Sequence, residues 1–306
     1  MVLLRCLGWG MGFFLAFALS AADVLRVGTY NLENYVGPAA ANRPAKTAEG
    51  RAKVCESILA MKADVVALQE MGGTNELLEL RGALKKGGLD FPHWEWVAGF
   101  DTNIHLAILS RFPLVARRAH TNDSFLLGGR RFRVSRGFAE VEIQARPDYK
   151  FTLLNAHLKS RRPIGQADET ELREQEAAVL REKIDACFRA HPQINLIVVG
   201  DFNDLKDSRA VRSILGRGKN KLIDTRPAEK ESADSSGGPP RAAHRQVTWT
   251  HFYEKEDVYS RIDYILLSPG MAREWLPAET SIVTLPNWGV GSDHRPLVAG
   301  FSIGDK

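Results

Sequence analysis

Two short polar motifs combine residue types that handle cations and protons. Residues 291–296 read Gly-Ser-Asp-His-Arg-Pro, and residues 199–204 read Val-Gly-Asp-Phe-Asn-Asp. An Asp-His pair supplies a carboxylate for a cation and an imidazole that exchanges protons near neutral pH, while Asp-x-Asn adds a second carboxylate beside an amide. Either motif alone is typical of a surface turn. Together they suggest the chemistry of a divalent-metal phosphoesterase.

Four apolar runs of strand length end in carboxylate, amide or imidazole side chains. Each run and the polar residues after it are Val24–Tyr30 with Asn31 and Glu33, Asp64–Leu68 with Gln69 and Glu70, Phe151–Leu154 with Asn155 and His157, and Ile194–Val199 with Asp201 and Asn203.

The order reverses in the last third of the chain. Asp263 precedes the apolar run Tyr264–Leu267, and Asp293 with His294 precedes Pro296–Ala299. If these two strands run antiparallel to the first four, all six polar clusters arrive at one edge of the sheets. We therefore expect one site built from both ends of the chain.

An amphipathic helix is predicted between the first and second apolar runs, and another between the third and fourth. Val54, Ile58 and Met61 follow the i, i+4, i+7 spacing of an amphipathic helix. A second helix is outlined by Leu172, Val179, Ile184 and Cys187. Residues 24–70 and 151–204 are thus predicted to form two versions of one β-α-β unit, with strands that are largely apolar on both faces. This pattern predicts a layered sandwich with helices outside and two sheets inside.

Seven short motifs follow one another in order between residue 24 and about residue 300. They are Thr29–Glu33, Leu68–Glu70, His105–Arg111, Asn155–Leu158, Gly200–Asn203, Arg261–Tyr264 and Ser292–Pro296. This series resembles that of the endonuclease/exonuclease/phosphatase superfamily, which includes pancreatic deoxyribonuclease, abasic-site endonucleases, inositol-polyphosphate phosphatases and neutral sphingomyelinases. The resemblance implies a four-layer α/β sandwich, with two mixed β-sheets packed face to face and helices on both outer sides. Because members of the superfamily share their reaction chemistry but differ in substrate, the resemblance implies the type of reaction and does not identify the substrate.

The resemblance also implies a metal site at the strand ends. Asn31 and Glu70 offer the hard oxygen ligands that Mg²⁺ prefers, and Asp293 completes the arrangement. We expect Mg²⁺ as the cofactor, with Mn²⁺ or Ca²⁺ as alternatives. The structural alternative for Asn31 is a cap on a strand-end turn.

The same resemblance assigns roles to five further side chains. His294 would activate the water, with Asp263 bound to its other ring nitrogen. Asp201 and Asn203 would position the nucleophile and the scissile phosphate. His157 would face the phosphate from the other side, either stabilising charge or donating a proton to the leaving group. The structural alternatives are an Asx turn at Asn203 and a simple ion pair between Asp263 and Arg261.

Charge is informative mainly through its distribution. The formal net charge of +4 is too small to indicate nucleic acid by itself. Arg136 and Lys159 adjoin site motifs and are candidate substrate contacts. The neighbouring arginines at 130, 131 and 133 fit either a phosphate-binding surface or a solvated edge. The resemblance to deoxyribonuclease-like members also implies an acidic partner for His157, and Asp101 is the candidate.

Three functions remain open. The first is an exported phosphodiesterase or nuclease, acting by in-line attack of an activated water on a phosphodiester, with nucleic acid as one substrate class. The second is a lipid- or sugar-phosphate hydrolase, although the sequence gives no obvious exposed hydrophobic hairpin for a membrane surface. The third is a non-catalytic binding module on the same fold, which would be expected to have lost metal or base residues.

The N-terminus has the features of a signal peptide. A short basic start, an apolar core at Leu7–Leu19 and small residues at 18–22 predict a leader over residues 1–22, with an uncleaved membrane anchor as the alternative. We expect residues 23–306 to be a single catalytic domain, monomeric and without a stable membrane span, exported to the periplasm or the medium. Cys55 and Cys187 are predicted to be buried small hydrophobes on opposite outer faces and not a disulfide.

Overall fold

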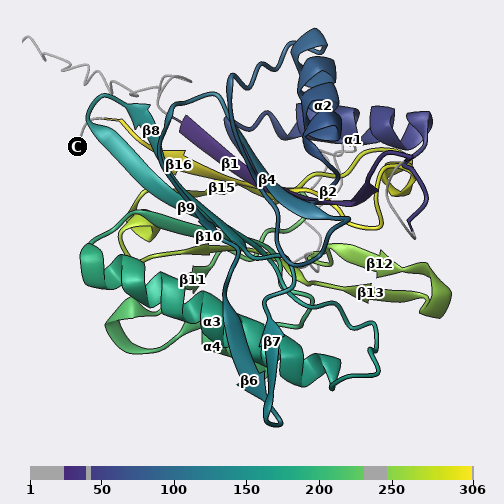
Figure 1. Cartoon of the computed structure of the whole chain (residues 1–306). Helices are drawn as coiled ribbons and strands as arrows, with labels where there is room; N and C mark the ends of the chain where they lie inside the picture. The colour runs from purple at the N-terminus through teal and green to yellow at the C-terminus, as the bar shows by residue number, and fades with distance from the viewer. Residues whose placement is uncertain (1–23, 39–42, 231–246, 305–306) are drawn as a thin grey trace, which may run out of the picture.

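Two six-stranded mixed sheets form the centre of the fold (Figure 1). The computed structural model describes residues 24–38, 43–230 and 247–304, so the predicted leader, residues 1–22, lies outside the described residues. One sheet has the strand order β15 (Trp275–Ile282), β16 (Leu297–Ser302), β1 (Val24–Tyr35), β2 (Val65–Met71), β4 (His105–Ser110) and β3 (His93–Val97). The other has the order β11 (Ile223–Asp224), β14 (Asp263–Leu267), β10 (Leu196–Asp201), β9 (Tyr149–His157), β8 (Phe138–Arg146) and β5 (Leu114–His120).

Helices cover both outer faces of the paired sheets. Figure 1 shows α1 (Ala48–Met61) and α2 (Thr74–Lys86) on one side, and α3 (Glu169–Ala190) and α4 (Arg209–Leu215) on the other. Short 3₁₀ helices lie in the connections: η2 (Gly218–Asn220), η3 (Glu254–Glu256), η4 (Met271–Arg273) and η5 (Trp288–Val290). Among the described residues, no helix has the length and apolarity needed to cross a membrane. The predicted four-layer α/β sandwich is confirmed.

The hydrophobic core is divided into three layers, as four stacked layers of elements require. The central layer joins the two sheets, through side chains such as Val27 and Val65 from one and Leu153 and Val199 from the other. A second layer joins α1 and α2 to the first sheet, and a third joins α3 and α4 to the second. Each inner strand is therefore buried on both faces, which explains its unbroken apolar sequence.

The two predicted amphipathic helices are present and begin at side-chain caps. The Thr47 hydroxyl accepts from the Gly50 backbone N–H at the start of α1, and the Asp168 carboxylate does the same for Thr170 and Glu171 at the start of α3. The apolar positions expected from periodicity are buried in both helices. Cys55 and Cys187 lie on these two helices as free thiols, in different core layers. The prediction that they do not pair is confirmed.

Two small hairpins project from the sandwich (Figure 1). The first pairs β6 (Ser124–Leu127) with β7 (Arg130–Arg133), and the second pairs β12 (His251–Tyr253) with β13 (Val258–Ser260). In the second hairpin Tyr253, Val258 and Tyr259 are exposed to 41%, 42% and 52%. This exposed apolar hairpin was not obvious from the sequence. Alternation along such short strands is too brief to distinguish an exposed apolar face from a buried one.

Candidate active site

Six strand ends deliver polar residues to one edge of the two sheets. β1 runs parallel to β2, and β9 runs parallel to β10, whereas β14 and β16 are antiparallel to β10 and β1 respectively. These directions confirm the sequence prediction. The register places Asp201 between His157 on one neighbouring strand and Asp263 on the other. Gly200 permits this close approach, because a Cβ at its φ of +132° would lie 1.9 Å from the Ala156 carbonyl oxygen.

The Asp201 carboxylate is the hub of the cluster. It is almost completely buried, and its Oδ1 accepts from the Asn203 backbone N–H at 2.8 Å. Its Oδ2 accepts from the side-chain amides of Asn31, 3.0 Å away and from the other sheet, and of Asn203, 3.2 Å away. The Nε2 atoms of His157 and His294 lie 3.5 Å and 3.7 Å from the same oxygen. One carboxylate oxygen thus faces both imidazoles.

His294 and Asp263 form a buried imidazole–carboxylate pair. Asp263 Oδ2 lies 2.8 Å from His294 Nδ1 and also accepts from the Thr250 hydroxyl at 2.6 Å. This arrangement leaves His294 Nε2 directed at the cluster. Asp263 does not pair with Arg261, the structural alternative, because the Arg261 guanidinium is engaged by the Asp224 carboxylate.

Burial and neighbouring charge act in opposite directions on this pair. Burial lowers the pKa of His294, but the Asp263 and Asp201 carboxylates outweigh it and hold the pKa well above the usual 6.5. Burial, reinforced by Asp263, raises the pKa of Asp201 to about 7. The protonation states of His294 and Asp201 are therefore linked to each other.

His157 is in a different electrostatic environment. Burial lowers its pKa well below 6.5, and the nearby cationic groups of Arg136 and Arg43 lower it further. Its Nε2 lies 3.5 Å from Asp201 and 3.9 Å from Glu70, and its Nδ1 has no hydrogen-bond partner among the described residues. His157 is therefore a neutral imidazole with an orphaned ring nitrogen.

Asp101 is not the acidic partner of His157. Its Oδ1 accepts from the backbone N–H groups of Asn103 and Ile104, and its Oδ2 lies 3.7 Å from Arg136 Nε and 3.9 Å from Arg43. Asp101 thus pairs with Arg43 and Arg136, and not with the imidazole of His157.

The predicted metal ligands are linked through backbone groups. The Asn34 N–H donates to Glu70 Oε2 at 2.8 Å, and the Glu33 N–H donates to Asn31 Oδ1 at 3.0 Å. The Asp293 N–H donates to Glu33 Oε2 at 3.2 Å, so Glu33 adds a carboxylate that the sequence prediction did not assign. Such an oxygen-rich donor set fits a hard divalent cation.

Backbone strain marks the same region. Four residues without a glycine's freedom have positive φ here: Glu33 (45°), Asn34 (57°), Glu70 (58°) and Asn203 (54°). Residues other than glycine adopt this conformation uncommonly, and such strain concentrates at functional sites. The backbone therefore adopts a strained conformation at these strand ends, as is typical of functional sites.

Two cations face the carboxylates and were not anticipated. The Lys46 side chain is 8% exposed, and its ammonium donates to the Gly291 carbonyl at 2.6 Å and lies 3.8 Å from Glu33. Arg43 lies 4.0 Å from Glu70 and bonds to the Asn34 side chain. Both precede α1, far from any motif, so no local spacing signals their position.

Of the two predicted substrate contacts, only Arg136 lies against the cluster. It is buried and donates to the Leu158 carbonyl at 3.0 Å, next to His157. The Lys159 ammonium instead donates to the carbonyls of Ser160 and Arg162, at 2.9 Å and 2.8 Å. Lys159 directly follows a site motif in the sequence, but this closeness did not predict the direction of its long side chain.

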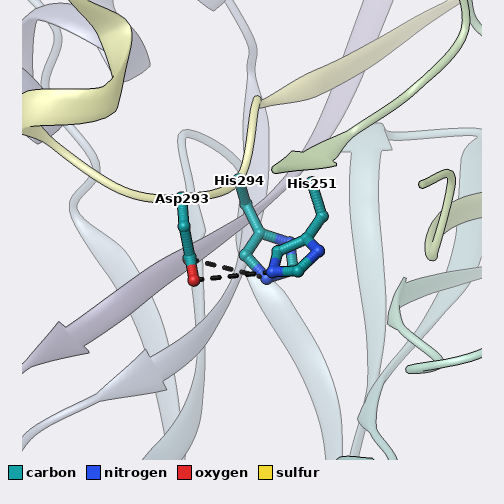
Figure 2. A group of neighbouring side chains, drawn as sticks. All are labelled: His251, Asp293 and His294. Atoms are coloured by element: carbon teal, nitrogen blue, oxygen red, sulfur yellow. Dashed lines mark ion pairs between the residues drawn. The ribbon is translucent and has the colours of Figure 1, made fainter. Parts of the chain in front are cut away.

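Two overlapping groups of side chains have metal-binding geometry among the described residues. One comprises Asp201, Asp263 and His294, and the other comprises His251, Asp293 and His294 (Figure 2). His251 lies on β12, with its ring centroid 4.6 Å from that of His294.

Comparisons with known proteins agree with this fold. The Endonuclease/Exonuclease/phosphatase family model matches residues 28–294. The human Nocturnin catalytic domain with bound sulfate is 19% identical, covering 92% of this chain and 94% of that chain with a TM-score of 0.63. Beta toxin from Staphylococcus aureus is 14% identical, covering 90% of this chain and 99% of that chain with a TM-score of 0.64. The Neisseria 3′ phosphatase NExo, bound to a product DNA hairpin, is 19% identical (90% and 99% covered, TM-score 0.58). No curated protein sequence matches the chain.

Proposed function

Because the chain belongs to the endonuclease/exonuclease/phosphatase family, we propose that it is an exported, divalent-metal-dependent phosphodiesterase that hydrolyses the P–O bonds of nucleic acid. The observation that carries this proposal is the approach of two imidazoles in opposite protonation environments to one carboxylate oxygen, Oδ2 of Asp201. Groups whose environments push their pKa values apart are typical of acid–base sites.

His294 is the base of the proposed reaction. Its Nε2 accepts the proton of the attacking water, and the imidazolium that forms is stabilised by Asp263 at Nδ1, 2.8 Å away. Asp201, held by the amides of Asn31 and Asn203, orients the water for in-line attack.

His157 contacts the phosphate from the other side. Since burial and neighbouring cations keep this imidazole neutral, it is poorly suited to supply a full proton to the leaving oxygen. It acts instead as a hydrogen-bond donor to a non-bridging oxygen. Arg136, fixed by the Leu158 carbonyl, adds positive charge beside it.

Asn31, Glu70 and Asp293 would hold the divalent cation, with Mg²⁺ as the expected ion and Mn²⁺ or Ca²⁺ as alternatives. When bound, such an ion neutralises charge on the phosphate oxygens and on the leaving oxygen. Glu33 and Lys46 border this ligand set, and the Lys46 ammonium offsets part of its negative charge.

Nucleic acid is favoured as the substrate by the arginines of β7. Arg130, Arg131 and Arg133 are exposed and have no carboxylate within ion-pairing distance in the described part of the chain. β7 ends three residues before Arg136, which lies in the site. Exposed guanidinium groups of this kind suit the phosphates of a polyanionic strand. NExo, one of the structural neighbours, is bound to DNA, which supports the same class.

A phospholipid is the second candidate substrate, because the β12–β13 hairpin exposes apolar side chains next to His251. Substituting Tyr253 and Tyr259 by serine separates the candidates. A lipid hydrolase would lose activity on vesicles and retain it on a soluble diester, whereas a nuclease would be unaffected on DNA.

The proposal includes the leader and the domain boundaries. Residues 1–22 form a signal peptide, and residues 23–306 form one monomeric catalytic domain that acts in the periplasm or the medium. The charged, small-residue and apolar segments of the leader support this assignment.

A substrate screen tests the proposed function. The mature chain is incubated with DNA, RNA, sphingomyelin vesicles, inositol phosphates and an aryl phosphodiester, with and without Mg²⁺. His294→Ala is the inactive variant, and His191→Ala, at an exposed position beyond α3, is the matched control. We expect Mg²⁺-dependent cleavage of nucleic acid that only His294→Ala abolishes. Hydrolysis of none of these esters, or full activity in His294→Ala, would refute the proposal.

A further inference from the structure

His251 and His294 form a cross-strand pair that is fixed by the backbone. The Phe252 N–H donates to the Asp293 carbonyl at 2.9 Å, and the Arg295 N–H donates to the Thr250 carbonyl at 2.7 Å. This pattern makes the two histidines a directly opposed antiparallel pair without mutual backbone bonds. In such pairs the side chains approach closely on one face. The backbone register of the two segments therefore places the two imidazoles next to each other.

Both rings direct Nε2 toward Asp293, as Figure 2 shows. His251 Nε2 lies 3.5 Å from Asp293 Oδ2, and His294 Nε2 lies 3.7 Å from Asp293 Oδ1. A tetrahedral ion with bonds of about 2.1 Å to nitrogen and oxygen requires its ligand atoms to be about 3.4 Å apart. The observed nitrogen–oxygen separations are near that edge, although they involve the two different oxygens of the Asp293 carboxylate. One ligand atom from each of the three residues lies within 4.8 Å of the other two.

The opposite nitrogens of the two rings are held by polar groups. Asp263 contacts Nδ1 of His294 at 2.8 Å, and the Ser260 hydroxyl lies 3.4 Å from Nδ1 of His251. Metal-binding histidines typically have such a partner on the second nitrogen, which fixes the tautomer and orients the ring. The side chains of His251 and His294 are 16% and 6% exposed, while that of Asp293 is 38% exposed and leaves an access route.

We propose that His251, Asp293 and His294 form a second cation site, selective for a borderline transition ion such as Zn²⁺ or Co²⁺ over Mg²⁺. Two imidazoles and one carboxylate suit such ions, whereas Mg²⁺ prefers oxygen ligands. The site goes beyond the proposed function, whose cation ligands contain no nitrogen. The lone pair of His294 Nε2 cannot both bind an ion and accept a proton, so occupancy of this site excludes the base role of His294.

Spectroscopic titration with Co²⁺ tests the site without reference to activity. Metal-stripped full-length protein is titrated in excess Mg²⁺, and the visible absorption of nitrogen-ligated Co²⁺ is recorded. We expect one saturable equivalent in the wild type and displacement by Zn²⁺. His251→Gln should weaken Co²⁺ binding at least about ten-fold, because even lost second-shell contacts weaken metal binding by about that much. His191→Gln, which removes an exposed histidine, is the matched control and should titrate as the wild type.

Further variants separate this site from the oxygen site. Glu70→Gln should retain the Co²⁺ absorption, since Glu70 is not among the three ligands. Asp293→Asn, which preserves side-chain shape, should also lose it, even if His251→Gln is poorly folded. Because Asp293 is shared with the proposed oxygen site, Glu70→Gln is the variant that distinguishes the two sites. Identical titrations of the wild type and a folded His251→Gln would overturn the inference. Co²⁺ binding by a protein that hydrolyses no phosphoester would refute the proposed function and leave this inference intact.

Discussion

The coupling between His294 and Asp263 gives the most quantitative prediction. The Nδ1–Oδ2 separation is 2.8 Å, and the two side chains are 6% and 2% exposed. A hydrogen bond to a charged group contributes about 1.5–3 kcal/mol, and about 1.4 kcal/mol corresponds to a ten-fold change in rate. Because the imidazolium forms during water activation, Asp263→Ala should lower kcat by about 10- to 150-fold.

The double variant distinguishes a catalytic unit from two independent effects. Independent losses would multiply, whereas residues that act together are strongly non-additive. With His294 removed, Asp263 has no imidazole left to orient. His294→Ala/Asp263→Ala should therefore be within about three-fold of His294→Ala alone. Asp224→Asn is the matched control, because it breaks the ion pair with Arg261 without touching His294.

The pH profile supplies an independent readout. A base acts in its deprotonated form, and Asp263 raises the pKa of His294. Loss of the carboxylate should lower that pKa and move the acidic limb of kcat/KM to lower pH, measured on an aryl phosphodiester at saturating Mg²⁺. Multiplicative losses in the double variant, together with an unmoved acidic limb in Asp263→Asn, would refute the assignment of the pair.

Three further predictions concern single groups and the leader. In initial-rate assays, His157→Ala should lose activity to a similar extent on alkyl and aryl phosphodiesters, because a neutral imidazole acts on the phosphate oxygen and not on the leaving group. If the variant kept much more activity on the aryl ester than on the alkyl ester, His157 would instead be the general acid. Asp201→Asn should abolish turnover yet raise the melting temperature in chelator at pH 8. Burial raises the pKa of Asp201 to about 7, so at pH 8 the folded wild type holds an ionised carboxylate, at a cost in stability on the order of a few kcal/mol. The difference in melting temperature between Asp201→Asn and the wild type should shrink as the pH falls below 7, because the folded wild type then takes up the proton. A difference in melting temperature that does not change with pH would argue against this explanation. Expressed in a bacterium, the protein should carry its N-terminus at Ala21 or Asp23 in the periplasm or medium, as determined by terminal sequencing, whereas an intact Met1 in the membrane fraction would indicate an anchor.

The parts of the site that follow strand ends could be predicted from the sequence. Runs that are apolar on both faces specify buried strands, and the polar residues after them specify the edge at which they meet. Asn31, Asp201 and Asp263 are accordingly brought together with both histidines. The switch of polar residues from the end to the start of the last strands also predicted their antiparallel direction.

The remaining contacts depend on tertiary register and side-chain direction, which leave no local pattern. His251 meets His294 only because residues 250–252 pair with residues 293–295. The Lys46 ammonium donates to the Gly291 carbonyl, 245 residues away in the sequence. The Lys159 ammonium donates to the carbonyl of its neighbour Ser160, although Lys159 follows a motif. Long flexible side chains are governed by the nearest available acceptors, which only the fold reveals.

Metal dependence tests the central claim most directly. Initial rates on a phosphodiester are measured against free Mg²⁺ for the wild type and Glu70→Gln, with Glu79→Gln, an exposed acid on α2, as the control. Since few protein ligands hold the ion, excess chelator should abolish hydrolysis reversibly without changing the circular dichroism spectrum, and Glu70→Gln alone should require more Mg²⁺. Full activity of the wild type in excess chelator would contradict the proposed mechanism.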